Sequence, residues 1–170
     1  TTFVLTVVFD LVVAIEVGVV LAAVLFMRRM ADTADVKPWK YVEQADVTPG
    51  EAEKLLSVPK HIRVFEISGP MFFAAADKLL SLNTKNYTKI IVIRMRSVPA
   101  VDASAMKSLR EFVARAKKNG ITVIFSHVNE QPMRVMQKSG FYDKVGKDNF
   151  CKNIYAAIDR AENLLKESLN

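Results

Sequence analysis

The side chains that most often perform catalysis are few in this sequence of 170 residues, and their spacing matches no catalytic pattern. The two histidines, His61 and His127, belong to no HExxH sequence, and no cysteine pair or triad partner lies at a suitable spacing from them. Both adjoin apolar runs, so we interpret them as polar residues at strand ends. No glycine-rich phosphate loop is present either. The sequence therefore favours binding over catalysis, with no metal and no cofactor.

Cys151 is the single cysteine, which excludes an internal disulfide and fits a reducing compartment. It has neither a CxxC partner nor a histidine at ligand spacing. We therefore interpret it as a structural thiol.

The most informative local sequence is VPAVDASAMKSL at residues 98–109. A proline-bearing turn leads there into Asp102, at the predicted start of a helix. Aspartate is among the best N-cap residues because its carboxylate accepts a free N–H of the first turn, so a simple cap is one interpretation. The other is a surface, formed by Asp102, Ala103 and Ser104, that is presented to a protein partner or an anion. Phosphorylation of Ser104 would add about two negative charges there.

Strand and helix patterns alternate around this turn. The sequence predicts strands at 40–47, 61–67, 89–95 and 121–125, and helices at 49–58, 73–82, 102–119, 130–138 and 150–169. Gly120 is expected in the left-handed conformation that ends the preceding helix. The alternation predicts an α/β fold with a mostly parallel central β-sheet and helices packed on it.

The first 31 residues have a different composition. Residues 3–27 form an apolar run of 25 residues in which only Asp10 and Glu16 are charged. A helix of that length spans about 37 Å, enough to cross a hydrocarbon core of about 30 Å. Arg28 and Arg29 follow, which places the rest of the chain on the cytoplasmic side.

The two acids inside the apolar run need an explanation, because a carboxylate at mid-membrane costs about 2.5–3.5 kcal/mol. Asp10, Ala14 and Gly18 lie on one i+4 ridge, where small residues let a second helix approach closely. Glu16 lies about 120° away around the helix. One interpretation is a helix packed inside a multi-helix membrane domain, with at least one acid pointing inward. The other is a lone anchor that tolerates both acids.

The formal net charge of +6 is concentrated in residues 85–118, which hold nine lysines and arginines against two acids. A basic surface attracts acidic lipid headgroups, an acidic protein or nucleic acid, and it is also typical of a merely solvated face. No zinc-finger spacing and no aromatic RNA-binding signature is present, so nucleic acid is not expected.

The DASA sequence at residues 102–105, the strand–helix order around it and Ser139-Gly140-Phe141 resemble a STAS domain, the module shared with anti-sigma-factor antagonists. The opening stretch resembles the last transmembrane helix of SulP-family anion transporters, which a cytoplasmic STAS domain follows directly. Since the sequence begins with Thr1-Thr2, we expect part of a longer protein or a processed product. The domain boundaries that follow are 1–31 for the last transmembrane helix and its basic flank, 32–40 for a linker, and 41–170 for the STAS domain.

This resemblance implies the regulatory C-terminal end of a secondary anion transporter of the sulfate, bicarbonate or dicarboxylate class. It implies regulation, assembly and protein interaction in the inner (plasma) membrane, and no enzyme activity. The expected partners are membrane lipid, the upstream transmembrane domain of the same chain, a second copy in a homodimer, a cytoplasmic protein and, weakly, a nucleotide. The family's anion site precedes this part of the chain, so no residue here inherits a substrate-binding role.

Two other interpretations stay open. A membrane-tethered signalling module like the anti-sigma-factor antagonists would use a phosphorylated serine directly after the aspartate of the turn. Here Ala103 occupies that position and Ser104 the next, and a simple tether gains nothing from the two acids of the apolar run. A domain that binds GTP or ATP beside Asp102 is permitted by the basic residues but supported by no phosphate loop.

Overall fold

The structure is a computed structural model that describes residues 11–33, 35–38, 50, 54, 56–71 and 87–169. The predicted strand at 40–47 and the predicted helix at 73–82 lie outside these residues. Of the predicted helix at 49–58, Gly50, Lys54 and Leu56 are described as helical.

A mostly parallel sheet forms the centre of the described domain, as predicted. Its spatial order is β1-β2-β3-β4-β5, with β1 antiparallel to β2 and every other neighbouring pair parallel. The predicted strands at 61–67, 89–95 and 121–125 are confirmed to within two residues at each end. The strands are β1 Asp35–Pro38, β2 Ile62–Ser68, β3 Ile90–Ser97, β4 Thr122–Ser126 and β5 Phe150–Cys151.

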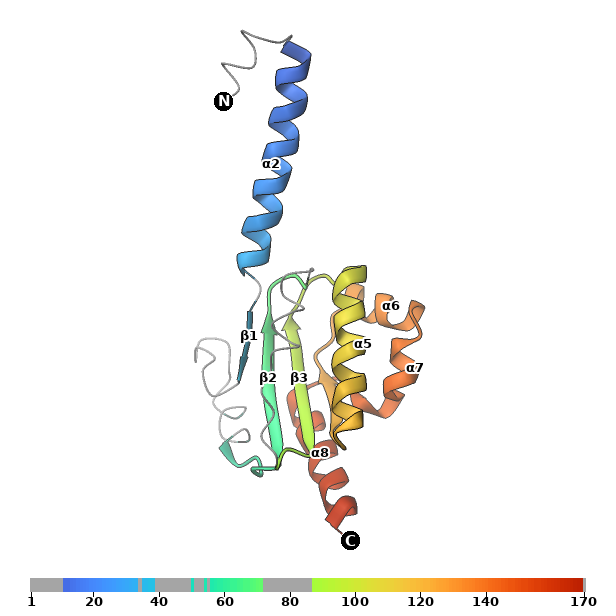
Figure 1. Cartoon of the computed structure of the whole chain (residues 1–170). Helices are drawn as coiled ribbons and strands as arrows, with labels where there is room; N and C mark the ends of the chain where they lie inside the picture. Colours follow the sequence, from blue (N-terminus) through green and yellow to red (C-terminus); the bar gives the residue numbers. More distant parts are fainter. Residues whose placement is uncertain are drawn as a thin grey trace.

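Helices cover both faces of this sheet (Figure 1). Because the parallel strands follow one another in sequence order, right-handed crossovers place their connecting helices on one face. α5 lies on that face and α8 on the other. The helices are α2 Leu11–Thr33, α5 Ala103–Lys118, α6 Glu130–Lys138, α7 Phe141–Val145 and α8 Ile154–Leu169, with the short 3-10 helix η3 at Lys147–Asn149.

Alternation along the strands divides the core into two layers. Phe65, Ile93 and Phe125 point to the α5 side, whereas Val92 and Ile124 point to α8. Both faces of β3 are therefore buried, which explains its continuous apolar sequence. The inward residues of α8 are Ile154, Ala157, Ile158, Ala161 and Leu165.

Two predicted assignments are wrong at the edges of the sheet. Residues 35–38 were assigned to the linker 32–40, yet they pair with β2 and form β1. Pro38 does not prevent this pairing, because β1 is an edge strand and pairs on one side only. Phe150 and Cys151 were assigned to the last helix, yet they form β5. The ring of Phe150 stacks on that of Phe125 with centroids 5.2 Å apart and planes 15° apart, so tertiary packing overrides the helical pattern there.

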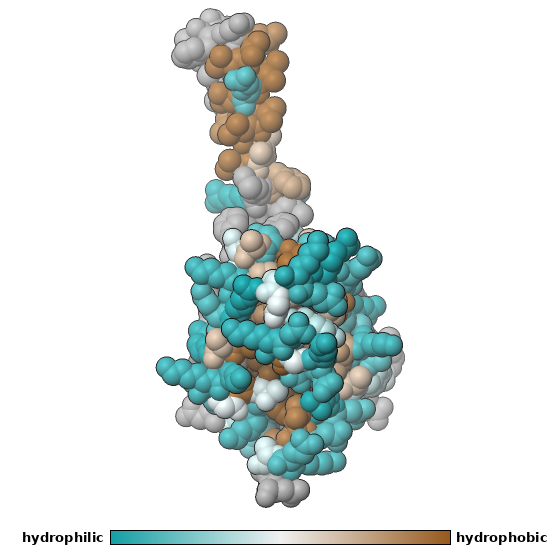
Figure 2. All heavy atoms as spheres, turned by 90° about the vertical axis from the view of Figure 1, so that its right-hand side faces the viewer, coloured by the Kyte–Doolittle hydropathy of each residue, from teal (hydrophilic) through white to brown (hydrophobic). Residues whose placement is uncertain are grey.

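The helix α2 projects from the end of the domain where the β2 and β3 arrows finish (Figure 1). Its surface is largely apolar, in contrast to the hydrophilic domain (Figure 2). Among the residues that the structure describes, no helix is long and apolar enough to cross a membrane. The predicted span began at residue 3, and residues 1–10 lie outside the described part, so the transmembrane assignment of 1–31 stays a prediction. The exposed large apolar residues of α2 are Leu11, Val12, Val13, Ile15, Val19, Val20, Leu21, Val24, Leu25 and Phe26.

Candidate functional site

The turn between β3 and α5 ends at Asp102, which is the N-cap of α5 as predicted. The Asp102 backbone is extended, with φ −97° and ψ 179°, and its Oδ1 accepts a hydrogen bond of 2.7 Å from the N–H of Ala105. Gly120, with φ +70°, ends the same helix as predicted. The cap interpretation of Asp102 is therefore confirmed, while a role in binding stays a prediction.

Two amide side chains from the β4–α6 region hold this turn in place. The N–H of Val101 donates to Oε1 of Gln131 at 3.0 Å, and Nε2 of Gln131 donates back to the Val101 carbonyl at 3.3 Å. Nδ2 of Asn129 donates to the carbonyls of Arg96 at 2.9 Å and Val98 at 2.8 Å. The sequence did not predict this brace, because nothing local relates residues about 30 positions apart.

The segment after β2 holds the turn from the other side. The N–H of Met71 donates to the Ala100 carbonyl at 2.9 Å, and the N–H of Asp102 donates to the Met71 carbonyl at 3.2 Å. Gly69, at φ +81°, donates to the Ser97 carbonyl at 2.9 Å. With its backbone held in this way, the turn is a rigid platform that exposes the side chains of Ala103 and Ser104.

Replacing Asp102 by alanine is expected to lower the free energy of unfolding by about 1 kcal/mol, because the N–H of Ala105 loses its acceptor. Urea denaturation measures the loss. Asp102→Asn is the control, since asparagine caps helices about as well. An equal loss in both variants would mean that the carboxylate charge, and not the cap, stabilises the turn.

The predicted site residues Ala14, Glu16 and Gly18 lie in α2, away from this turn (Figure 1). Glu16 is exposed, Ala14 is buried and Gly18 is half-buried. Asp10 lies outside the described residues. The structure thus brings Asp102, Ala103 and Ser104 together but does not join them to Glu16, and the packing role of Ala14 and Gly18 stays a prediction.

The histidines lie at strand ends, as predicted. Exposed His61 precedes β2, and its Nδ1 lies 2.8 Å from the carbonyl oxygen of Tyr87. His127 follows β4 with φ +53°. Cys151 is half-buried in β5; burial raises the pKa of its thiol, and the nearby positive charge of Arg160 partly offsets this. Throughout the described ranges, no group of three or more His, Cys, Asp or Glu residues could hold a metal ion.

A buried ion pair near the carboxyl end of the sheet was not predicted. Nη1 of Arg94 lies 3.0 Å from Oε2 of Glu66, and the two side chains are 0% and 3% exposed. They occupy paired positions in β2 and β3, with Ser126 paired to Arg94 in β4. All three lie on the α8 face, where neighbouring positions of the same strands are aliphatic. The individual strand sequences contain nothing that identifies Arg94 and Glu66 as partners.

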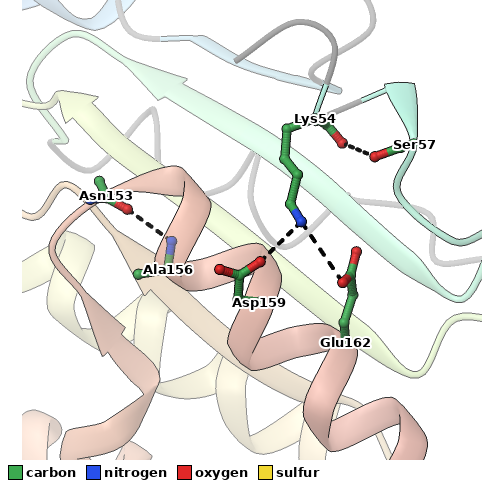
Figure 3. A network of polar contacts seen from close by, with 6 residues as sticks. All are labelled: Lys54, Ser57, Asn153, Ala156, Asp159 and Glu162. Atoms are coloured by element: carbon green, nitrogen blue, oxygen red, sulfur yellow. Dashed lines mark hydrogen bonds and ion pairs between the residues drawn. The ribbon is translucent and has the colours of Figure 1, made fainter. Parts of the chain in front are cut away.

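Lys54 connects the helical segment before β2 to the outer surface of α8 (Figure 3). Its Nζ lies 3.0 Å from Oδ1 of Asp159 and 3.9 Å from Oε2 of Glu162. The hydrogen bond to Asp159 raises the pKa of Lys54 above its usual 10.5, burial opposes the shift, and Glu162 adds to it. A Cβ at Gly50 would lie 3.1 Å from the Tyr155 hydroxyl, so this segment approaches α8 closely.

Because the folded state raises the pKa of Lys54, its stabilising effect is fully present below about pH 10 and is lost as the pH rises through the raised pKa. A Lys54→Met variant is therefore expected to be less stable than the wild type at pH 7, with the difference shrinking above pH 10.5. Urea denaturation across alkaline pH measures this difference. A difference that did not change with pH would assign the effect to packing of the Lys54 stem instead.

Comparison with known proteins agrees with this architecture. The STAS domain family matches residues 54–161. The STAS domain of a SulP transporter from Vibrio cholerae superimposes with a TM-score of 0.58 at 25% identity, covering 68% of this chain and 96% of that one. The chain therefore belongs to the STAS domain family.

The curated relatives of the chain are named as transporters. The putative sulfate transporter YvdB of Bacillus subtilis (strain 168) is 28% identical over 152 residues, which are 88% of this chain and 27% of that protein. The bicarbonate transporter BicA of Synechocystis is 27% identical over 151 residues, which are 86% of this chain and 27% of that protein. The chain is thus homologous to SulP-family sulfate and bicarbonate transporters and spans about a quarter of their length.

Proposed function

We propose that the chain is the regulatory C-terminal part of a SulP-type secondary anion transporter of the sulfate, bicarbonate or dicarboxylate class. The observation that carries the proposal is the extent of the match to the transporters. It covers 152 residues in one relative, whereas the STAS family match runs only from 54 to 161. The likeness therefore extends beyond the STAS domain. The apolar surface of α2 supports the assignment of residues 1–31 as the last transmembrane helix.

The connection between α2 and the sheet supports an orientation of the domain. α2 ends at Thr33 and β1 begins at Asp35, so one residue separates them. Asp35 pairs with Ser68, which pairs with Ser97 at the end of β3. The end of α2 thus adjoins the carboxyl edge of the sheet, where the Asp102 turn lies. If the apolar run ends in the membrane at Met27, six helical residues, or about 9 Å, lead to Thr33.

In this arrangement the Asp102 turn is a contact surface on the membrane-facing edge of the domain. The exposed side chains of Ala103 and Ser104 would meet the transmembrane domain of the same chain or its lipid. The STAS domain lies on the cytoplasmic side of the membrane. There it regulates transport, assists assembly as a homodimer and binds cytoplasmic proteins. No step of catalysis is assigned to it.

Membrane fractionation tests the anchor. The chain 1–170 is expected in the carbonate-resistant membrane pellet, and a version starting at residue 32 in the supernatant. A pellet that keeps the shortened version would overturn the anchor assignment. Sequencing the coding DNA upstream of Thr1 tests the transporter itself: about a dozen further apolar spans support it, whereas a start codon within a few residues supports the membrane-tethered signalling module.

Site-directed fluorescence tests the orientation, with Cys151→Ser as the background that leaves no native thiol. A fluorophore on Ser104→Cys is expected to transfer more energy to a headgroup-labelled lipid than one on Asn119→Cys. The two positions lie at opposite ends of α5, whose 16 residues span about 24 Å. Equal transfer from both, or stronger transfer from Asn119→Cys, would contradict the membrane-facing position of the turn.

A further inference from the structure

Three exposed lysines of the window 85–118 lie close to the starts of the parallel strands. Lys89 lies directly before β3, and Lys117 and Lys118 lie in the last turn of α5. Lys60 joins them just before β2. All four side chains are exposed. We call these four lysines the basic amino edge, because they lie where the parallel strands begin.

Backbone hydrogen bonds at the strand starts place these lysines on one surface. The N–H of Lys89 donates to the His61 carbonyl, next to Lys60, at 2.9 Å, and the Lys89 carbonyl accepts from Thr122 at 2.9 Å. The N–H of Gly120 donates to the Lys117 carbonyl at 3.0 Å. Gly120 lies in the connection from α5 to β4, the strand that begins at Thr122. Three neighbouring strand starts are about 10 Å wide, so the lysines form a compact surface.

Within the described residues, no ion pair joins an acid to the basic amino edge. In the ion pairs found between described residues the cations are Lys54, Arg94, Lys107, Arg134 and Lys147, and none of the four lysines. Asp102 and Glu130 begin helices at the opposite edge of the sheet. Lys117 and Lys118 are placed favourably at the negative C-terminal end of the α5 dipole, which partly explains why lysines occur there. The dipole does not account for Lys60 and Lys89, which belong to other elements.

An exposed aromatic side chain borders the same surface. Tyr87 is 43% exposed and lies edge-to-face against His61, with ring centroids 6.3 Å apart. Nδ1 of His61 also lies 2.8 Å from the Tyr87 carbonyl oxygen, which orders the pair. Tyrosine is enriched in protein interfaces, where its large ring supplies contact area.

The position of this surface argues against membrane lipid as its binding partner. β3 has eight residues, about 26 Å, between the edge next to α2 and the basic amino edge. That is about three times the Debye length of about 8 Å at physiological salt. This step rests on the proposed function, because it assumes that α2 leads to the membrane. Nucleic acid is disfavoured because four lysines would neutralise few phosphates, and such contacts weaken steeply with salt.

We propose that the basic amino edge, with Tyr87 beside it, is a docking surface for an acidic segment of a cytoplasmic protein. The lysines attract and orient the segment by charge complementarity, and the tyrosine supplies apolar contact. The surface faces away from α2, so a partner bound there would not compete with contacts at the Asp102 turn.

The full chain in nanodiscs of zwitterionic lipid provides the test, with a fluorescent helical peptide of glutamate and alanine as the probe. Fluorescence anisotropy is expected to detect binding that weakens about tenfold or more in Lys117→Glu/Lys118→Glu. The matched control is Lys138→Glu/Lys144→Glu, which makes the same charge change at exposed positions of α6 and α7. Thermal melts establish that both variants fold.

Three outcomes would overturn the proposal: no binding by the wild type, an equal loss in both double variants, or tighter binding of a single-stranded oligonucleotide of equal charge. The second would assign the effect to net charge and the third to nucleic acid. The assay needs neither transport nor the upstream chain. Its failure therefore leaves the proposed transporter role unaffected, and membrane fractionation tests the anchor separately from the peptide result.

Discussion

Replacing Arg94 by leucine is expected to lower the free energy of unfolding by about 3–5 kcal/mol, because it removes one partner of a buried ion pair. Arg94 is 0% exposed and lies 3.0 Å from the carboxylate of Glu66. Without the guanidinium, the buried carboxylate of Glu66 loses the cation that lies 3.0 Å from it. Urea denaturation followed by circular dichroism measures the change.

The double variant Glu66→Leu/Arg94→Leu separates the cost of removing one partner from the net value of the pair. Replacing both partners of a buried pair by apolar residues is often neutral or stabilising, so most of the lost stability is expected to return. A double variant as unstable as Arg94→Leu would show that the pair itself contributes the stability. In that case the ion pair of Glu66 and Arg94 on the α8 face would be required for stability and not only tolerated.

Replacing Phe125 by alanine is expected to cost about 3–5 kcal/mol, because it removes a fully buried ring from the aromatic cluster of Phe125, Phe141, Tyr142 and Phe150. Phe125 is fully buried, stacks on Phe150 at 5.2 Å and meets Phe141 edge-to-face at 5.6 Å. Since Phe150 belongs to the two-residue strand β5, the variant should also loosen the pairing of β5 with β4. Hydrogen exchange at the N–H of His127, which donates to the Cys151 carbonyl, reports on that pairing.

Phe125→Leu is the matched control, because leucine fills most of the ring volume without aromatic contacts. Its cost is expected to be less than half that of alanine. Similar costs for leucine and alanine would mean that ring stacking, and not volume, holds β5. Fast exchange at His127 without a large loss of global stability would instead make β5 a locally unfolding edge.

The parts of the site that could be predicted depend on local chemistry. Asp102 was identified as a cap because aspartate before a helical pattern satisfies N–H groups only three residues away. Gly120 was identified in the same way, from the positive φ that a helix end requires. The brace by Asn129 and Gln131 could not be identified, because their partners lie about 30 residues earlier and no local pattern marks them.

The sequence by itself determined the α/β class, the three central strands and the faces of α8, because apolar periodicity reports directly which side of an element must leave water. It also determined the apolar character of α2. Only the tertiary structure decided the two edge strands, the Glu66–Arg94 pair and the gathering of four lysines at the strand starts. These features depend on which strands become neighbours, and that choice is made by packing between residues far apart in the chain.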